Sequence, residues 1–227
     1  MKYGIMGAMP DEVDQLCARL SGVEMQQYAG VEYHQGRLGD KEVVVCCAGM
    51  GKANAAATTQ VLCGKFGAQA IIFSGIAGNM SEEIGIGDVV VGKEVCYHDA
   101  EVSMICQSAP FLKSYTGDPA LVQAALDACA ALGVKAIAGR IATGDTFVGD
   151  GATKAVIAEK VHPDCVEMEG AAVSQIAARN GVPCVVLRAM SDNADESGHE
   201  LLVVKKFSIA EYVTTATAIV ARMLESL

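Results

Sequence analysis

The sequence lacks the features that would direct it to a membrane or to nucleic acid. No apolar run approaches the roughly 20 residues that a bilayer-spanning helix needs, and the first residues do not have the layout of a signal peptide. Lysine and arginine number 17 against 27 aspartates and glutamates, which gives a formal net charge of −10. Because phosphate binding relies on basic side chains, nucleic acid is not expected as a partner. We expect a cytoplasmic protein without a membrane partner.

Recognised metal and nucleotide motifs are also missing. The nine cysteines are odd in number and show neither a CxxC spacing nor a Cys/His pattern of the zinc type. We interpret them as small apolar core residues in a reducing compartment. The glycine-rich stretch 49–52 matches neither GxxxxGK[ST] nor GxGxxG, and tight packing explains its glycines nearly as well as an anion site does. No metal and no organic cofactor is expected.

Apolar runs that alternate with helical patterns are abundant. Hydrophobic residues make up 52% of the 227 residues, enough for a sizeable core. The predicted strands cover 3–9, 31–37, 42–47, 70–73, 89–95, 136–142 and 184–187. The predicted helices cover 10–20, 53–65, 118–132, 153–160 and 207–225, and 103–117 is expected to be a long loop. This order predicts an α/β fold, a three-layer α/β/α sandwich around a central mixed, mostly parallel sheet, in a single domain over 1–227.

Carboxylates gather where predicted strands and helices meet. Asp192 follows the apolar run 184–187, and Glu167 and Glu169 precede a helical pattern. Polar residues after the carboxyl end of a buried strand are the usual way in which an α/β sheet presents chemistry. Glu12 falls in the first turn of a helix, where the dipole favours an acid whether or not it is functional. His98, next to Asp99, is more simply a structural histidine.

Seven short motifs, taken in order, resemble the 5′-methylthioadenosine/S-adenosylhomocysteine nucleosidases of the purine nucleoside phosphorylase superfamily. Each motif alone is a weak signal, but their joint order and spacing are specific. They are Gly7-Ala8-Met9 with Glu12, Gly49-Met50-Gly51-Lys52, Gly75-Ile76-Ala77-Gly78, Tyr97-His98-Asp99-Ala100 with Val102, Gly144-Asp145-Thr146-Phe147, Val166-Glu167-Met168-Glu169, and Arg188-Ala189-Met190-Ser191-Asp192.

The resemblance implies hydrolysis of the N-glycosidic bond of methylthioadenosine and S-adenosylhomocysteine, and also of 5′-deoxyadenosine. Asp192 would protonate adenine N7 and Ser191 would support it, while Glu12 would position and deprotonate the attacking water. Such a pair suits the chemistry, because one acid must donate a proton to the leaving base and another must accept one from water. Burial would keep Asp192 protonated, and the helix dipole would keep Glu12 ionised.

The resemblance also implies residues that bind the nucleoside. Glu169 would hold the ribose hydroxyls and Met168 would pack under the sugar. Phe147 would stack on the base, the backbone at Val148 would read its edge, and Gly78 would lie in the substrate-binding loop. Arg188 is interpreted as a buried ion-pair partner, with Glu167 as its counterpart.

The residues that would contact the 5′ end of the substrate depart most from the family pattern. Met9, Met50 and Phe207 would enclose the ribose and the alkylthio group, although the segment before Phe207 differs from the family pattern. Ile76 stands where some members carry a serine that makes a small contact near the water. The family further implies a homodimer, with part of 103–117 reaching towards the neighbour's pocket.

Of three alternative functions, the sequence argues against two and separates the third poorly. A purine nucleoside phosphorylase needs a phosphate site usually built from arginines, and Ala8, Met9, Met50 and Ile76 offer none. A futalosine or aminodeoxyfutalosine nucleosidase shares these motifs and is poorly separated by sequence. A catalytically silent nucleoside-binding protein would not need an acid and a base together.

Overall fold

The computed structural model describes residues 1–199 and 210–227. The strands are β1 (Lys2–Gly7), β2 (Ser21–Tyr28), β3 (Val31–Leu38), β4 (Lys41–Cys47), β5 (Ala70–Asn79), β6 (Val89–Tyr97), β7 (Tyr115–Thr116), β8 (Ala136–Thr143), β9 (Cys165–Glu167) and β10 (Cys184–Asp192). The helices are α1 (Pro10–Cys17), α2 (Lys52–Gly64), α3 (Val102–Ile105), α4 (Pro119–Ala131), α5 (Gly151–Val161), α6 (Gly170–Arg179), α7 (Glu196–His199) and α8 (Ala210–Ser226).

The strands form one mixed sheet, as predicted from the alternation of strands and helices. Its centre is the parallel series β4-β1-β5-β10, to which β3 and β2 add antiparallel strands at one edge. At the other end β5 pairs with β10, β10 with β6, β6 with β8, β8 with β9, and β9 with β5. These five strands therefore close into a ring, and β5 belongs to both the ring and the open part of the sheet.

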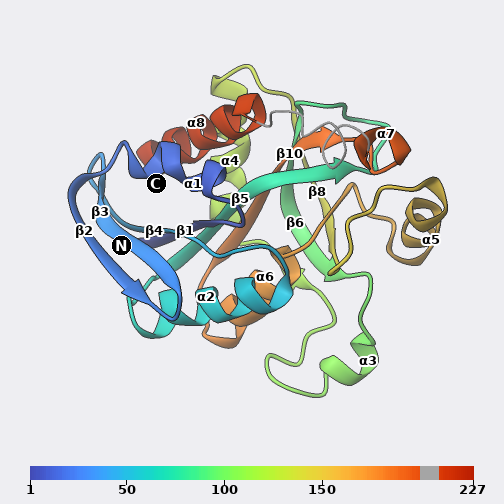
Figure 1. Cartoon of the computed structure of the whole chain (residues 1–227), viewed down its shortest axis with the longest axis horizontal. Helices are drawn as coiled ribbons and strands as arrows, with labels where there is room; N and C mark the ends of the chain where they lie inside the picture. Colours follow the sequence, from blue (N-terminus) through green and yellow to red (C-terminus); the bar gives the residue numbers. More distant parts are fainter. Residues whose placement is uncertain (200–209) are drawn as a thin grey trace.

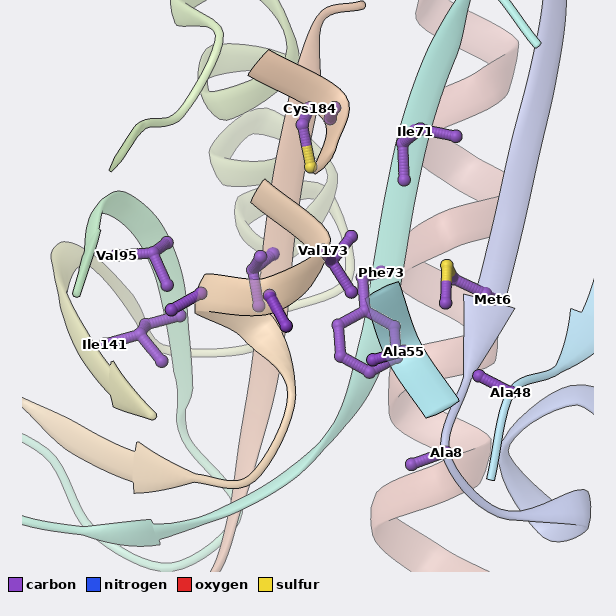
Figure 2. Packing of buried hydrophobic residues seen from close by; sticks show 14 of the residues in the cluster. Met6, Ala8, Ala48, Ala55, Ile71, Phe73, Val95, Ile141, Val173 and Cys184 are labelled. Carbon is purple, nitrogen blue, oxygen red and sulfur yellow. The ribbon is translucent and has the colours of Figure 1, made fainter. Parts of the chain in front are cut away.

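Two layers of helices cover the sheet (Figure 1). One core cluster joins the sheet to α2 and α6 through residues such as Leu62 and Val173. A second cluster joins the opposite face to α1, α4 and α8 through residues such as Leu16 and Val220. Figure 2 shows the first cluster around Phe73 of β5. The buried faces of these helices explain the predicted three layers, since each helix can bury an apolar stripe only against the sheet.

Several element boundaries differ from the sequence-based prediction. The strand expected over 70–73 continues to Asn79, because β10 pairs along it as far as Gly78 and β9 pairs with Gly78 and Asn79. These pairings outweigh the low strand propensity of its glycines. Strand β2 was not predicted, since its residues are all exposed and show no alternating pattern. The stretch 103–117, expected to be a loop, contains most of α3 and all of β7.

Other predictions are confirmed. The strands expected over 31–37 and 42–47 are β3 and β4, which pair as an antiparallel hairpin. Asp118 caps α4 by accepting hydrogen bonds from Ala120 and Leu121. Helix α8 begins at Ala210, and the start expected at 207 lies outside the described residues. Among the helices that the structure describes, none is long and apolar enough to cross a membrane.

Candidate active site

The first carboxylate of the site, Glu12, is held by backbone N–H groups from the segment after β1 and from β5. It lies in the first turn of α1, which Pro10 begins directly after β1. Its Oε2 accepts hydrogen bonds from the N–H groups of Ala8 at 2.6 Å and Met9 at 2.9 Å. Its Oε1 accepts one from Ile76 of β5 at 3.2 Å. The carboxylate is thereby fixed at the carboxyl end of β1 and beside β5.

Burial raises the pKa of Glu12 above its ordinary value, while Arg188 and the three N–H groups lower it. The net direction differs from the expectation that the helix dipole keeps this acid strongly ionised. Burial prevails because only 6% of the residue is exposed and water is removed from its charge. A carboxylate whose pKa is raised is a stronger proton acceptor, which suits a general base.

A buried guanidinium links two further carboxylates. Arg188 of β10 is 1% exposed, and its Nη2 donates a hydrogen bond to Glu167 Oε2. The same nitrogen lies 3.4 Å from Glu169 Oε2, and the guanidinium carbon is 4.2 Å from the ring centroid of Phe73. The predicted pairing of Arg188 with Glu167 is therefore confirmed, and Glu169 shares the same cation.

Glu167 also shapes the start of α6. Its Oε2 accepts hydrogen bonds from the N–H groups of Glu169 at 3.1 Å and Gly170 at 2.7 Å, and its Oε1 accepts one from the Thr143 hydroxyl. Arg188 completes the set of donors around this carboxylate. Glu167 thus satisfies first-turn N–H groups of the helix and fixes the backbone from which the Glu169 side chain projects.

The pKa of Glu169 is subject to several opposing electrostatic effects. Its Oε1 accepts a hydrogen bond from the N–H of Gly51 at 2.8 Å. Burial, and then the negative charge of Glu167, raise the pKa of Glu169 to about 7, against the lowering effects of Arg188 and Gly51. The group can therefore exist with or without its proton near neutral pH.

Asp192 ends β10 and is 3% exposed. Its Oδ1 accepts a hydrogen bond from the N–H of Ala194 at 2.8 Å. The Ser191 hydroxyl lies 2.8 Å from Asp192 Oδ2 and 3.3 Å from the carbonyl oxygen of Ala77. Since a hydroxyl has one hydrogen and two lone pairs, it can donate to ionised Asp192, or donate to Ala77 and accept from protonated Asp192. Ser191 can therefore serve this acid in both protonation states.

Two glycines let these acids approach β5 closely. A Cβ atom at Gly75 would lie 2.5 Å from Glu12 Oε1 and closer still to Arg188 Nη1. A Cβ atom at Gly78 would lie 3.0 Å from Asp192 Oδ1. Three residues of strand span about 10 Å, so the two carboxylates contact β5 at points separated by that distance.

A pocket of about 230 Å³ opens beside Asp192. It is lined by residues from β5, β9, β10 and the segment after β8, namely Gly78, Thr146, Phe147, Val148, Val166, Glu167, Met168 and Asp192. Apolar walls with two acids, Glu167 and Asp192, and backbone groups are suited to a flat heteroaromatic ring. Five of the residues singled out from sequence line this pocket together: Gly78, Phe147, Val148, Met168 and Asp192.

The remaining predicted residues lie less centrally. Met9 and Ile76 contribute the N–H groups that hold Glu12, whereas the side chain of Met50 is largely exposed. Phe207 lies outside the described residues. The buried His98 packs against Gly144, which agrees with the structural role expected for it.

Sequence reasoning missed Thr143 as a contributor to the site. Its hydroxyl donates to Glu167, and its oxygen accepts a hydrogen bond from the N–H of Ala171 at 2.8 Å. A threonine at the end of a predicted strand, directly before Gly144, was the available signal. Its partner is 24 residues away and could be identified only from the parallel pairing of β8 with β9.

Comparison with known proteins places this geometry in context. The model of the phosphorylase superfamily matches residues 2–225. The 5′-methylthioadenosine/S-adenosylhomocysteine nucleosidase of Shewanella sediminis is 42% identical over 201 residues, which are 86% of this chain and 87% of the relative.

Two solved structures are similar over the whole chain. The 5′-methylthioadenosine/S-adenosylhomocysteine nucleosidase of Colwellia psychrerythraea, in complex with adenine, has a TM-score of 0.92 at 32% identity, covering 100% of this chain and 96% of that one. The futalosine hydrolase of Helicobacter pylori has a TM-score of 0.89 at 30% identity, covering 100% of this chain and 98% of that one.

Proposed function

Because the chain belongs to the 5′-methylthioadenosine/S-adenosylhomocysteine nucleosidases of the phosphorylase superfamily, we propose that it is an N-glycosyl hydrolase. Its substrates are methylthioadenosine and S-adenosylhomocysteine, and also 5′-deoxyadenosine. The products are adenine and the 5′-substituted ribose. Such a reaction belongs to methionine salvage and to the recycling of adenosylmethionine by-products. Similarity to a nucleosidase that holds adenine supports the nature of the leaving base.

The proposed mechanism uses the two acids that contact β5. Asp192 donates its proton to adenine N7 while the C1′–N9 bond breaks, so that the base leaves as a neutral molecule. Glu12 accepts a proton from water, whose oxygen forms the new bond to C1′. The raised pKa of Glu12 supports the second role, and the two possible hydrogen-bond arrangements of Ser191 support the first.

Binding is assigned to the residues around the pocket. Adenine stacks on Phe147, with its edge on the backbone at Val148 and on Gly78. Glu169 accepts hydrogen bonds from the ribose hydroxyls, and Met168 packs under the sugar. A carboxylate suits this task because it can accept from two vicinal hydroxyls. Met9, Met50, Ile76 and Phe207 are proposed to enclose the remainder of the substrate.

One observation carries the proposal. Glu12 and Asp192, 180 positions apart in the sequence, are both buried against the short segment of β5 that contains Gly75 and Gly78. A protein that only bound nucleosides would gain nothing from two buried acids there, since each costs free energy to desolvate. The burial of both acids in one site therefore favours an enzyme that uses acid–base chemistry over a protein that only binds nucleosides.

The test is adenine release from a panel of nucleosides, with and without phosphate. We expect free adenine and 5-methylthioribose from methylthioadenosine in phosphate-free buffer. Turnover that requires phosphate would show a purine nucleoside phosphorylase instead. A futalosine or aminodeoxyfutalosine nucleosidase, the second candidate, is favoured by the similarity to futalosine hydrolase. Faster turnover of a futalosine-type substrate than of methylthioadenosine would select it.

We also infer that the chain acts as a homodimer. In the segment expected to reach a neighbour, Met104 and Phe111 are each 68% exposed, and Leu112 is exposed beside them. Exposed apolar side chains of this size commonly mark a protein interface. A monomer in sedimentation at assay concentration would contradict the inference.

Two further assignments are part of the proposal. The chain is inferred to be a single nucleosidase domain over 1–227, which the continuous sheet and the match over 2–225 support. A cytoplasmic location is supported by the nine cysteines, all of them free thiols, as expected in a reducing compartment. Fractionation of the cells that produce the protein would test the location.

A further inference from the structure

One peptide group joins the proposed general acid to a lysine on another element. The N–H of the Asn193–Ala194 peptide donates to Asp192 Oδ1 at 2.8 Å. The carbonyl oxygen of the same peptide, that of Asn193, accepts a hydrogen bond from Lys154 Nζ of α5 at 2.5 Å. The ammonium, the peptide and the carboxylate therefore form one hydrogen-bonded chain.

The same ammonium reaches the neighbouring strand. Lys154 Nζ also donates to the carbonyl oxygen of Asn79 at 3.2 Å. Asn79 ends β5 and follows Gly78, the residue paired with Asp192. A single cation thus joins the carboxyl ends of β5 and β10 at the point where Asp192 lies. Lys154 does not line the pocket beside Asp192.

The peptide that Lys154 holds precedes a strained residue. Ala194 has a φ of 51°, in the left-handed region, which is unfavourable for a residue with a Cβ atom. It is fully buried, and a Cβ atom at Gly78 would lie 2.8 Å from its Cβ. Such strain persists only where surrounding contacts impose it.

Rotation of this peptide would relieve the strain and remove a hydrogen bond that orients Asp192. Turning the Asn193–Ala194 peptide changes ψ of Asn193 and φ of Ala194, so φ could return to negative values. The same rotation would withdraw the N–H from Asp192 Oδ1 and turn the carbonyl away from Lys154. The ammonium opposes the rotation because a charge-assisted hydrogen bond is stronger than a neutral one. It also polarises the amide, which strengthens the N–H as a donor.

We propose that Lys154 is a positioning residue that holds Asp192 in its reactive orientation through the Asn193–Ala194 peptide. The inference rests on the proposed function of Asp192 as the proton donor. Lys154 acts on the carboxylate without touching the substrate. It therefore governs the rate of proton transfer more than the affinity for the nucleoside.

The test compares Lys154→Met with Lys160→Met in steady-state hydrolysis of methylthioadenosine. Lys160 lies on the same helix and also donates to a backbone carbonyl, that of His98, at 2.5 Å, so it controls for the loss of a lysine tether from α5. We expect Lys154→Met to lower kcat about tenfold to a hundredfold and to change KM less than threefold. Lys160→Met should leave kcat within about threefold of wild type.

Two more variants separate positioning from general stability. Lys154→Arg retains N–H donors and should recover most of kcat. Adding Ala194→Gly to Lys154→Met should recover part of the lost rate, because glycine adopts positive φ without strain and the peptide then has less reason to rotate. If Lys154→Met does not fold, as judged by its circular dichroism and thermal transition, the comparison of Lys154→Arg with wild type and Lys160→Met still tests the inference.

The outcomes that overturn the inference are distinct from failure of the proposed function. If wild type releases adenine and Lys154→Met keeps wild-type kcat, Lys154 has no positioning role. The same conclusion holds if Lys154→Met and Lys160→Met lose equal activity, if only KM changes, or if Lys154→Arg is as slow as Lys154→Met. If wild type itself releases no adenine, the proposed function is wrong.

Discussion

Arg188 Nη2 lies 3.4 Å from Glu169 Oε2 and donates a hydrogen bond to Glu167, with both carboxylates buried beside it. The guanidinium of Arg188 lies between Glu167, which fixes the start of α6, and Glu169, which is proposed to hold the ribose. Its charge also lowers the pKa of Glu12 against the effect of burial. Arg188 therefore interacts electrostatically with three carboxylates, which lie in α1, in β9 and at the N-cap of α6.

The first prediction concerns the stability that this cation provides. Arg188→Met should lower the free energy of unfolding by about 3–5 kcal/mol, because removing one partner leaves buried charges uncompensated. Urea denaturation at pH 7 measures the change. Arg222→Met is the matched control, since Arg222 forms an exposed pair with Glu225 on α8 and should cost about 1 kcal/mol or less. Equal losses in the two variants would contradict the assigned role of Arg188.

The second prediction concerns the pH dependence of stability. Burial and Glu167 raise the pKa of Glu169 to about 7 in the folded protein from an ordinary value of 4.5. The unfolded chain therefore releases this proton at lower pH than the folded one. The contribution of Glu169 to stability is fully present below about pH 4.5 and is lost as the pH rises through about 7.

Glu169→Gln removes this titration and should flatten that part of the profile. Unfolding free energies of wild type and variant, measured by urea denaturation between pH 5 and 8, provide the test. The difference between the two proteins should change across this interval, with the wild type losing stability relative to the variant as the pH rises. A constant difference would show that Glu169 titrates with an ordinary pKa.

The third prediction concerns the close approach of Gly78 to the proposed acid. In Gly78→Ala the new Cβ would lie 2.8 Å from the Cβ of Ala194 and 3.0 Å from Asp192 Oδ1. One of these neighbours must move, so kcat/KM should fall at least about tenfold. Gly85→Ala is the control, because a Cβ there meets nothing within 4 Å. Full activity in Gly78→Ala would mean that the segment adjusts without disturbing Asp192.

The residues that could be located from sequence are those whose position follows from local structure. Glu12 follows from Pro10 and the first turn of a helix, and Asp192 follows from the end of an apolar strand. The Arg188–Glu167 pair was inferred because a buried arginine requires a carboxylate. Local patterns placed these residues in the fold, whereas the catalytic roles of Glu12 and Asp192 were inferred from the family resemblance.

The features that escaped prediction depend on contacts made across the fold. The pKa of Glu12 is raised because burial outweighs the helix dipole, and burial cannot be determined from one helix turn. Thr143 reaches Glu167 only because β8 and β9 are paired. Lys154 looks like an ordinary solvated lysine in sequence, and its role becomes visible only when the ends of β5 and β10 lie together.

The fourth prediction separates the proposed acid from the proposed base. Glu12→Gln and Asp192→Asn should each lower kcat on methylthioadenosine by about a hundredfold or more, with the fold retained in circular dichroism. Both amides keep the shape of the side chain, but neither can perform the proton transfer. A similar loss in both variants cannot by itself say which acid serves the leaving group.

A substrate with an activated leaving group makes that distinction. The substrate is 5-methylthioribose with a nitrophenoxy group at C1. Nitrophenolate departs from it without protonation, whereas water must still be activated. Asp192→Asn should therefore retain most of the wild-type rate on this substrate, while Glu12→Gln should remain impaired. The assay is nitrophenolate absorbance, and the control is the loss of both variants on methylthioadenosine. If Asp192→Asn loses as much rate on the activated substrate as on the nucleoside, Asp192 binds the substrate and another group protonates the base.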